Sequence, residues 1–423
     1  MHIDINSCFA TIEQQANPRL RGKPTVVAAY AEDHGCILAA SREAKAIGID
    51  TGMRVSEAKA RCPFVEVLAP DPNKYRYINR ALLAILESYS CNVRVESIDE
   101  MVVDFAQTPR LDTQMRIMSA PDATEHEKTE HAMLLIAREI KQRIRREIGE
   151  WITVSIGIAP NRYLSKIASG LHKPDGLDMI TGKTIAKTFS TMRLEDFCGI
   201  KTGVATRLRI GGIYTPMSLL MSDAKTLERA LHSIVGRHWW MRLHGYEDGS
   251  RYTSFGAGVS ASEQKSFGHS HALGRALPPS DPKLWQVLSQ LVVKMGSRLR
   301  AAGCMAHSIG VSAMYSSYSD FWHTQKQLAG PLYADADFFS YSKSLLLSAP
   351  DLPIRILGVT CGKLTRDLYT QQSLLEYDVK KECVTRTIDQ LSEKYGKYTI
   401  VPARMIDSSQ KVMDRIAFGK ASI

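Results

Sequence analysis

The stretches IDINSCFA (residues 3–10) and ESIDEMVVDF (residues 96–105) decide the expected fold around three acidic residues. The first five residues alternate apolar and polar side chains through Asp4, and a helix-like stretch follows to residue 15. Two strand-like runs flank Asp99 and Glu100, which predicts a hairpin with both acids at its tip. Antiparallel pairing with the first strand could bring Asp4 beside them.

Three neighbouring carboxylates suit a magnesium site, because Mg²⁺ is a hard cation that prefers oxygen ligands. Enzymes of nucleotidyl transfer hold two such cations about 3.5–4 Å apart. Taken alone, however, an Asp–Glu pair at a hairpin tip is more often a solvated turn than a catalytic site. The surrounding sequence must decide between these two interpretations.

Length and composition set broad limits. A chain of 423 residues predicts two to four domains. Its hydrophobic content of 44% is that of a soluble globular protein, and no apolar run of about 18 residues predicts a membrane span. No signal peptide is expected, because Asp4 and Asn6 interrupt the first stretch. Eight scattered cysteines without a Cys-x-x-Cys pair argue against zinc and disulfides and favour a reducing cytoplasm.

The positive charge is unevenly distributed along the chain. The net charge is −1 over residues 1–180, +8 over residues 181–362 and +3 over residues 363–423. A polyanion such as nucleic acid is the expected partner of the middle segment. Solubility alone is the alternative explanation.

The order of expected elements indicates an α+β region followed by helices and then by a second mixed region. Strands are predicted at 24–30, 37–40 and 152–158, and helices at 41–47, 75–89, 132–147 and 161–170. Residues 107–130 are expected to be a surface loop and residues 172–176 a tight turn. Short helices with glycine turns follow from residue 181. Strands return from residue 256, with helices at 284–300, 334–347 and 379–395 and a short strand at 399–401.

Seven segments in order and spacing resemble the Y-family of DNA polymerases over residues 1–220. They are IDINSCFA (3–10), GKPTVV (22–27), GCILAASREAKAIGIDTGM (35–53), ESIDEMVVDF (96–105), VSIGIAPNRYLSKIAS (154–169), HKPDG (172–176) and CGIKTGVATRLRIGGIYT (198–215). Within the family, INSCF and GCILAASREAKAIGI are more similar to the catalytic subunit of bacterial polymerase V than to polymerase IV.

The resemblance implies an α+β right-hand polymerase with an additional α/β domain. The implied domains are the palm (1–9 and 72–180), small fingers (10–71), a helical thumb with a helix–hairpin–helix (181–250), a DNA-binding little finger (256–362) and a C-terminal tail (363–423). Residues 256–362 fit the little finger only by charge and by strand–helix order.

The resemblance also implies the site. Asp4, Asp99 and Glu100, with the backbone carbonyl of Ile5, match the residues that hold two Mg²⁺ ions. The remaining implied nucleotide-binding residues are Asn6, Ser7, Cys8, Phe9, Arg42, Lys45 and Lys173.

Two of these positions carry specific expectations. Phe9 falls at the steric-gate position, where a flat ring leaves no room for a ribose 2′ hydroxyl; ordinary core packing is the alternative. Lys173 matches the triphosphate lysine. Ala39, Arg42 and Lys45 depart from the hydroxyl, tyrosine and arginine common in the family, which puts nucleotide affinity in doubt.

The same resemblance predicts DNA and protein partners. The helix–hairpin–helix would bind backbone phosphates, although Lys201 replaces its usual second glycine and a helix pair without a DNA role is the alternative. Gln371, Leu374 and Leu375 resemble the peptide that docks bacterial polymerases on the sliding clamp. Accessory subunits are possible partners. Only three residues precede Asp4, so either the first strand is short or the native start lies upstream.

The expected function is template-directed DNA synthesis of low fidelity across damaged templates, with primer-template DNA and deoxynucleoside triphosphates as substrates. One alternative is a catalytically weak relative that acts as a DNA- and clamp-binding scaffold. The intact Asp4, Asp99 and Glu100 argue against it. Another is a nucleotide cyclase, whose catalytic domain resembles a palm but which has no reason to carry a helix–hairpin–helix.

Overall fold

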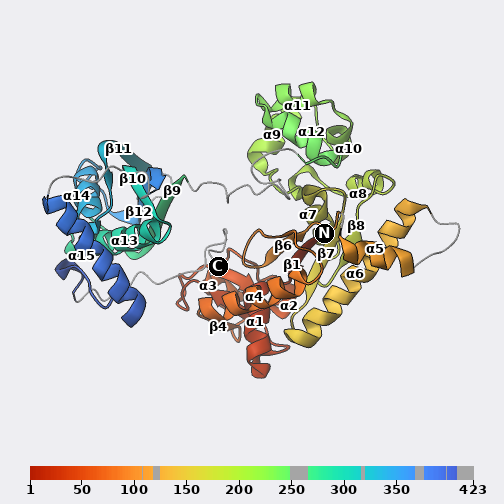
Figure 1. The fold of residues 1–423 in the computed structure, drawn as a ribbon, viewed down its shortest axis with the longest axis horizontal. Coiled ribbons are helices and arrows are strands. Elements are labelled where there is room, and N and C mark those ends of the chain that lie inside the picture. The colour runs from red at the N-terminus through yellow and green to blue at the C-terminus, as the bar shows by residue number, and fades with distance from the viewer. Residues whose placement is uncertain are drawn as a thin grey trace. The chain divides into compact units, whose positions relative to one another are not determined.

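A computed structural model describes residues 1–106, 108–117, 124–247, 265–315, 320–366, 376–396 and 398–406. The chain divides into two compact units, one within residues 1–259 and the other within residues 260–414. Each unit has its own sheet and hydrophobic core (Figure 1). None of the helices in the described ranges has the length and hydropathy of a membrane-spanning segment.

The first unit is built on a five-stranded sheet in the order β5-β6-β1-β7-β8. Its strands are β1 (His2–Ile5), β5 (Val93–Val95), β6 (Glu100–Val103), β7 (Val154–Ile158) and β8 (Leu177–Met179). β1 pairs antiparallel with both β6 and β7, and β7 pairs parallel with β8. The predicted hairpin is therefore confirmed, but Glu100 is the first residue of β6 rather than part of the tip.

Side chains along β1 alternate between the hydrophobic core and the face of the sheet that carries Asp4. Ile3 and Ile5 belong to the hydrophobic core, together with residues of α4 (Pro72–Glu87) and α6 (Glu125–Glu147). Successive side chains of a strand point to opposite faces, so Asp4 points to the other face. That face is covered by α7 (Arg162–Gly170), which contacts β7, β1 and β8 (Figure 1).

A glycine allows α7 to lie directly on the sheet. A Cβ atom on Gly157 would stand 2.0 Å from the carbonyl oxygen of Ser165 and 2.3 Å from the amide nitrogen of Ser169. Asn161 caps the helix by accepting a hydrogen bond from the Leu164 amide, at 2.8 Å. The bare Gly157 thus brings the polar side of α7 close to Asp4 and Glu100.

The first unit also contains a smaller sheet in the order β3-β2-β4. The elements of this region are α1 (Cys8–Ala16), η1 (Pro18–Leu20), β2 (Thr25–Ala28), β3 (Ile37–Ala40), α2 (Arg42–Ala46), α3 (Val55–Arg61) and β4 (Glu66–Leu68). They enclose a separate core around Val26, Ile37 and Ile49. The strands expected at 24–30 and 37–40 are confirmed, as is the helix at 41–47.

The described part of residues 107–130, which leaves out residues 107 and 118–123, is not the loop that was expected. α5 (Pro109–Ile117) occupies much of this stretch, and α6 begins at Glu125 rather than near residue 132. Thr124 accepts a hydrogen bond from the Glu127 amide, and the Glu127 side chain accepts one from the Thr124 amide. This reciprocal capping box starts α6 seven residues earlier than its apolar spacing suggests.

Short helices follow, as expected, and share a core around Phe189, Phe197 and Trp239. They are α8 (Ile185–Ser190), η2 (Leu194–Asp196), α9 (Thr202–Ile210), α10 (Pro216–Met221), α11 (Ala224–Leu231) and α12 (Val235–Leu243). Lys201, which precedes α9, has a φ of −112° and extended backbone. Any residue adopts that conformation, so Lys201 does not distort the turn.

The second unit is an antiparallel sheet in the order β11-β10-β12-β9, with helices packed against it. Its elements are β9 (Ser266–Leu277), α13 (Pro282–Ala301), β10 (Cys304–Tyr315), β11 (Phe321–Leu332), α14 (Asp335–Leu346), β12 (Ile354–Arg366), α15 (Glu376–Tyr395) and η4 (Ala403–Met405). The helices expected at 284–300, 334–347 and 379–395 are confirmed. The strand expected at 399–401 is wrong, because residues 399 and 400 form bends and residue 401 leads irregularly into η4.

Candidate active site

Asp4 and Glu100 lie directly opposite each other on β1 and β6. The amide of Ile5 donates to the carbonyl of Asp99 at 2.9 Å, and the amide of Val103 donates to the carbonyl of Met1 at 2.9 Å. Asp4 and Glu100 fall between these bonds and form a non-hydrogen-bonded pair, the kind that brings side chains closest. Asp99 precedes Glu100 and is near enough to Asp4 and Glu100 for both charges to act on it. These three acids are here called the carboxylate cluster.

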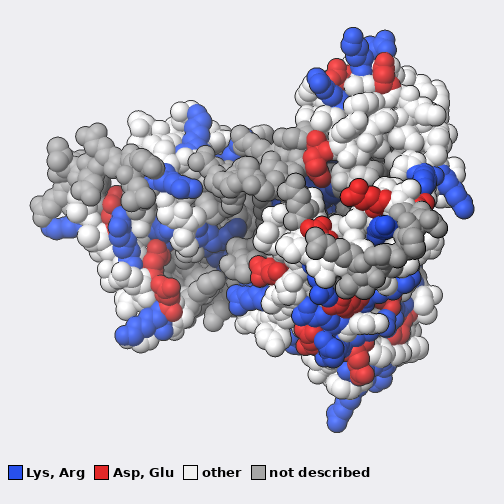
Figure 2. Space-filling view, turned by 45° about the vertical axis from the view of Figure 1, so that its right-hand side comes forward, with Lys and Arg blue, Asp and Glu red and all other residues white. Residues whose placement is uncertain are grey.

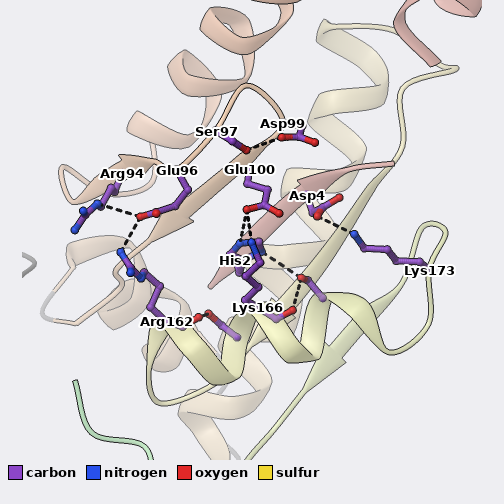
Figure 3. Close-up of polar contacts among 12 residues, drawn as sticks. His2, Asp4, Arg94, Glu96, Ser97, Asp99, Glu100, Arg162, Lys166 and Lys173 are labelled. Carbon is purple, nitrogen blue, oxygen red and sulfur yellow. Dashed lines mark hydrogen bonds and ion pairs between the residues drawn. The ribbon is translucent and has the colours of Figure 1, made fainter. Parts of the chain in front are cut away.

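Two lysines neutralise part of this cluster (Figure 3). Lys173 Nζ donates to Asp4 Oδ2 at 2.7 Å, and Lys166 Nζ donates to Glu100 Oε2 at 2.6 Å. Lys173 comes from the 172–176 turn and Lys166 from α7. Ser97 Oγ donates to Asp99 Oδ1 at 2.5 Å. The three carboxylates thus have two lysine partners, which leaves one formal negative charge in excess.

Asp99 and Glu100 differ in their electrostatic surroundings. Burial and the neighbouring Asp4 and Glu100 carboxylates raise the pKa of Asp99, although the Ser97 hydrogen bond opposes this. Burial also raises the pKa of Glu100, but His2 and Lys166 outweigh it and lower that pKa to about 2. The surroundings of Glu100 thus favour its charged form, whereas those of Asp99 disfavour it.

The donor chemistry of the cluster fits a hard divalent cation. Carboxylate oxygens and a backbone carbonyl are the ligands that Mg²⁺ takes, and the excess negative charge favours a cation. Within the described ranges, no group of three His, Cys, Asp or Glu side chains already has the geometry to hold a metal ion. Lys173 and Lys166 each bond one oxygen of Asp4 and Glu100 respectively, so a metal that used the same oxygens would have to displace these ammonium groups.

The 172–176 turn that carries Lys173 is fastened to the sheet and to α6. Lys141 Nζ donates to the carbonyl of Asp175 at 2.5 Å and forms an ion pair with its carboxylate at 2.9 Å. Arg145 also pairs with that carboxylate. On the other side, the amide of Ile156 donates to the carbonyl of Gly176 at 3.0 Å. The position of Lys173 opposite Asp4 is therefore built into the fold.

Residues 6–9 continue from β1 into α1. Asn6 is 4% exposed and its side chain bonds protein groups. Ser7 has a φ of +50° and precedes α1 without a capping bond from its side chain. Cys8 is buried, and burial with the nearby Asp99 and Asp4 raises its pKa well above the usual range. The side chains of Asn6 and Cys8 are thus enclosed by protein.

Phe9 is 2% exposed and stacks on Tyr75. The ring centroids are 4.4 Å apart and the ring planes differ by 16°. Tyr75 is held in turn, because its hydroxyl donates to Glu13 Oε1 at 2.9 Å and Lys74 Nζ pairs with Glu13 Oε2 at 2.6 Å. Phe9 is therefore a packed ring with rigid support, whichever role it has toward a nucleotide.

The departures at residues 39, 42 and 45 have different outcomes. Arg42 lies over the Trp151 ring, with 5.6 Å between Cζ and the ring centroid, and Arg21 lies over the same ring at 5.3 Å. Arg42 in α2 thus contacts Trp151, which precedes β7. Lys45 is exposed in the last turn of α2, and Ala39 is 7% exposed in β3.

Lys166 and His2 were not predicted as site residues. His2 is 1% exposed, with Nε2 3.7 Å from Glu100 Oε2 and Nδ1 3.2 Å from Ser169 Oγ. A signal for Lys166 was present in the sequence. Arg162, Lys166 and Ser169 recur at spacings of four and three, which places a polar stripe on one side of a helix that otherwise packs apolar residues.

Other predicted features can be located only in part. Gln371, Leu374 and Leu375 lie outside the described residues. Basic and acidic side chains are interspersed on the face drawn in Figure 2.

Comparison with known proteins gives a consistent result over most of the chain. Residues 3–170 match the impB/mucB/samB family, and residues 264–374 match the C-terminal domain of that family. The chain is 28% identical to DNA polymerase IV 1 of Bacillus subtilis (strain 168), covering 99% of this chain and 96% of that protein. It is 27% identical to DNA polymerase IV of Staphylococcus aureus (strain Mu3), covering 89% and 98%. The expected leaning toward polymerase V finds no support in these relatives.

Solved structures share the fold. A Y-family DNA polymerase chimera of Dbh and Dpo4 aligns with a TM-score of 0.69 at 21% identity, covering 86% of this chain and 98% of the chimera. An insertion ternary complex of Dbh DNA polymerase aligns with a TM-score of 0.54, covering 85% and 97%. Together with the matches in both units, these similarities confirm the expected fold class of palm, fingers, thumb and little finger. The chain belongs to the impB/mucB/samB family, within the Y-family of DNA-directed DNA polymerases.

Proposed function

We propose that this chain copies damaged DNA templates with low fidelity, using two Mg²⁺ ions held by Asp4, Asp99, Glu100 and the backbone carbonyl of Ile5. The observation that carries the proposal is the opposed pairing of Asp4 and Glu100, with Asp99 adjacent and one negative charge in excess. Two Mg²⁺ ions there would activate the primer 3′ hydroxyl and stabilise charge on the triphosphate.

The two lysines have separate tasks in this proposal. Lys173 is 43% exposed and makes an ion pair with Asp4 that a triphosphate oxygen could replace. On nucleotide binding, Lys173 would exchange Asp4 for the triphosphate and free that carboxylate. Lys166 is 36% exposed and would release Glu100 in the same way. Both exchanges swap one charged partner for another, which limits their cost.

Nucleotide selection would depend on residues 6–9. The supported ring of Phe9 would act as the steric gate beside the sugar, and its stacking on Tyr75 favours a fixed wall. Backbone amides near Ser7 and Cys8 would contact phosphates. Arg42 is engaged by Trp151, so a nucleotide contact by Arg42 would require it to leave that ring. Lys45 would supply at most a point charge.

DNA binding would fall to the later part of the chain, which carries the net charge of +8 over residues 181–362. The proposed domains keep the boundaries 1–9 with 72–180 for the palm, 10–71 for the fingers, 181–250 for the thumb, 256–362 for the little finger and 363–423 for the tail. The hairpin before α9 would contact backbone phosphates without reading sequence.

Further partners of the proposal are a sliding clamp, through Gln371, Leu374 and Leu375, and possible accessory subunits, in the cytoplasm. Replacing these three residues with alanine should remove stimulation by a clamp loaded on a long template. Activity on short primers should stay unchanged. Stimulation of the triple variant to the wild-type extent would place the docking peptide elsewhere.

Primer extension tests the proposed activity directly. The full chain is incubated with deoxynucleotides and a synthetic primer-template, with or without an abasic site, in Mg²⁺ or in chelator. We expect Mg²⁺-dependent extension that continues past the abasic site and a substantial frequency of misinsertion. Tight binding of the same DNA without extension would refute the proposal in favour of a scaffold role.

A further inference from the structure

The chain segments that carry Asp4 and Lys173 are joined a second time by Asn6. Asn6 lies two residues after Asp4, and Asp175 lies two residues after Lys173. The amide of Asp175 donates to Asn6 Oδ1 at 2.8 Å, next to the 2.7 Å ion pair between Lys173 and Asp4. One hydrogen bond thus ties the end of β1 to the 172–176 turn.

Both polar atoms of the Asn6 side chain form hydrogen bonds with protein groups. Nδ2 donates to Ser155 Oγ at 2.8 Å, and Oδ1 accepts from Thr153 Oγ1 at 3.2 Å as well as from the Asp175 amide. Because Asn6 is 4% exposed, turning it toward a nucleotide would break these bonds and leave buried polar groups unpaired. Its side chain is therefore placed to hold the turn rather than to bind the substrate.

The turn needs such support at the residue that Asn6 holds. Asp175 has a φ of +61°, a left-handed conformation that costs free energy in a residue with a side chain. Lys141 holds its carbonyl from α6, whereas Asn6 holds its amide from β1. Ser155 Oγ also accepts from the Gly176 amide at 3.3 Å. The backbone beside Lys173 is thus clamped between a helix and the sheet.

We propose that Asn6 is a positioning residue that fixes Lys173 opposite Asp4 and thereby sets the affinity for the incoming nucleotide. This inference rests on the proposed function, in which Lys173 binds the triphosphate. Without Asn6, the amide of Asp175 loses its acceptor and the turn becomes free to shift. Lys173 then spends less time where the triphosphate arrives, so KM for the nucleotide rises more than kcat falls.

The experiment compares five variants of the full chain in single-nucleotide insertion: three single variants at Asn6 and Thr153, Lys173→Ala, and Lys173→Ala combined with Asn6→Ala. Asn6→Ala removes the acceptor, Asn6→Asp keeps it, and Thr153→Val removes only the other donor to Oδ1. We expect Asn6→Ala to raise KM about tenfold with kcat changed less than about threefold, and Asn6→Asp and Thr153→Val to stay within about threefold of wild type. In a Lys173→Ala background, adding Asn6→Ala should change KM by less than about twofold, because both act through the same contact.

Hydrogen exchange of peptides spanning 172–177 gives a readout that does not depend on activity. It should speed up in Asn6→Ala and not in Asn6→Asp or Thr153→Val. Unchanged exchange in Asn6→Ala, or Asn6→Ala and Lys173→Ala effects on KM that multiply, would overturn the inference. If wild-type protein inserted no nucleotide, or if Lys173→Ala left KM unchanged, the proposed function would be at fault. The exchange comparison would still decide whether Asn6 holds the turn.

Discussion

Two groups of partly buried charges in this chain differ in how exposed their cationic side chains are. In the carboxylate cluster, the ion-paired lysines remain 43% (Lys173) and 36% (Lys166) exposed at the side chain. In the second unit, the side chain of Arg300 is 3% exposed and lies between Asp335 and Asp389. The first group can exchange its cations with solvent or ligand, whereas the second is closed.

The Arg300 centre uses every donor it has. Nε and one terminal nitrogen bond Asp389 at 2.5 and 2.9 Å, and the guanidinium also bonds Asp335 at 2.8 and 3.3 Å and the carbonyl of Tyr333 at 3.0 Å. These five bonds match the five N–H groups of a guanidinium. The centre connects α13, α14 and α15, so its role is to join helices.

The difference in exposure separates ion pairs that stabilise the fold from ion pairs that a ligand could replace. A closed ion pair holds elements together but cannot accept a ligand, because every partner is taken. The carboxylate cluster keeps a formal negative excess and exposed lysines, which is what the proposed exchange of these lysines for a metal and a triphosphate requires. The following variants test this contrast.

The largest effect is expected from Asp99→Ala or Glu100→Ala. Each removes a proposed metal ligand from the cluster without touching the basic segments, so extension should fall by at least about a hundredfold, or about 2.7 kcal/mol in the barrier. DNA affinity and melting temperature should stay close to wild type. Primer extension in Mg²⁺ and fluorescence anisotropy measure the two properties. Extension above a few per cent of wild type would disprove the ligand assignment.

Asp389→Ala should lower the stability of the protein rather than its rate of primer extension. It leaves a buried arginine short of a partner, and breaking such pairs costs about 3–5 kcal/mol in the free energy of unfolding. Denaturant unfolding of the full chain should show a loss of this size in the transition of the second unit. Asp337→Ala is the matched control. Its pair with Lys381 also joins α14 to α15, at 2.9 Å, but is more exposed, so a loss of at most about 1 kcal/mol is expected.

Equal losses in Asp389→Ala and Asp337→Ala would show that burial does not distinguish the two pairs. The Arg300 centre would then be no more closed than a surface ion pair.

Phe9→Ala tests a buried residue of the proposed site. Phe9 stacks on Tyr75, which is hydrogen-bonded to Glu13, so the ring is enclosed by protein as Arg300 is. Removing the ring should lower the preference for deoxy- over ribonucleotides by at least about tenfold, or about 1.4 kcal/mol. Single-nucleotide insertion measures the ratio, with Phe9→Tyr as the control that keeps the ring. A ratio that stays within twofold of wild type would mean that Phe9 is only core.

Much of the carboxylate cluster could be predicted, because strand alternation and the hairpin are local patterns. The proximity of Asp4 and Glu100 follows from the pairing of two extended runs, whereas the interpretation of Asp4, Asp99 and Glu100 as metal ligands needed the resemblance to a family. The role of Lys166 depends on a contact to Glu100 across 66 positions, and that contact exists because Gly157 lets α7 approach the sheet. No local pattern contains that information.

The errors in the fold have equally specific causes. Apolar spacing alone predicts too late a start for α6, because the helix begins at the Thr124–Glu127 capping box. The strand expected at 399–401 relied on the β-branched residues Thr399, Ile400 and Val401. Strand propensity depends on a partner edge, and these residues lead into η4 instead.

The smallest effect, and the most direct test of exchange, concerns Lys166→Ala. If Lys166 is a cation that metal must displace, its removal frees Glu100 and also removes a repulsive charge beside the metal. Both changes favour metal binding, so the Mg²⁺ concentration for half-maximal extension should fall about two- to fivefold. The measurement is a Mg²⁺ titration of extension at constant ionic strength. Lys183→Ala is the control, because Lys183 is 74% exposed and pairs with Glu127 only at 3.9 Å. A rise in the Mg²⁺ requirement would mean that Lys166 fixes Glu100 as Arg300 fixes its two aspartates, and the contrast between the open and the closed charge groups would no longer hold.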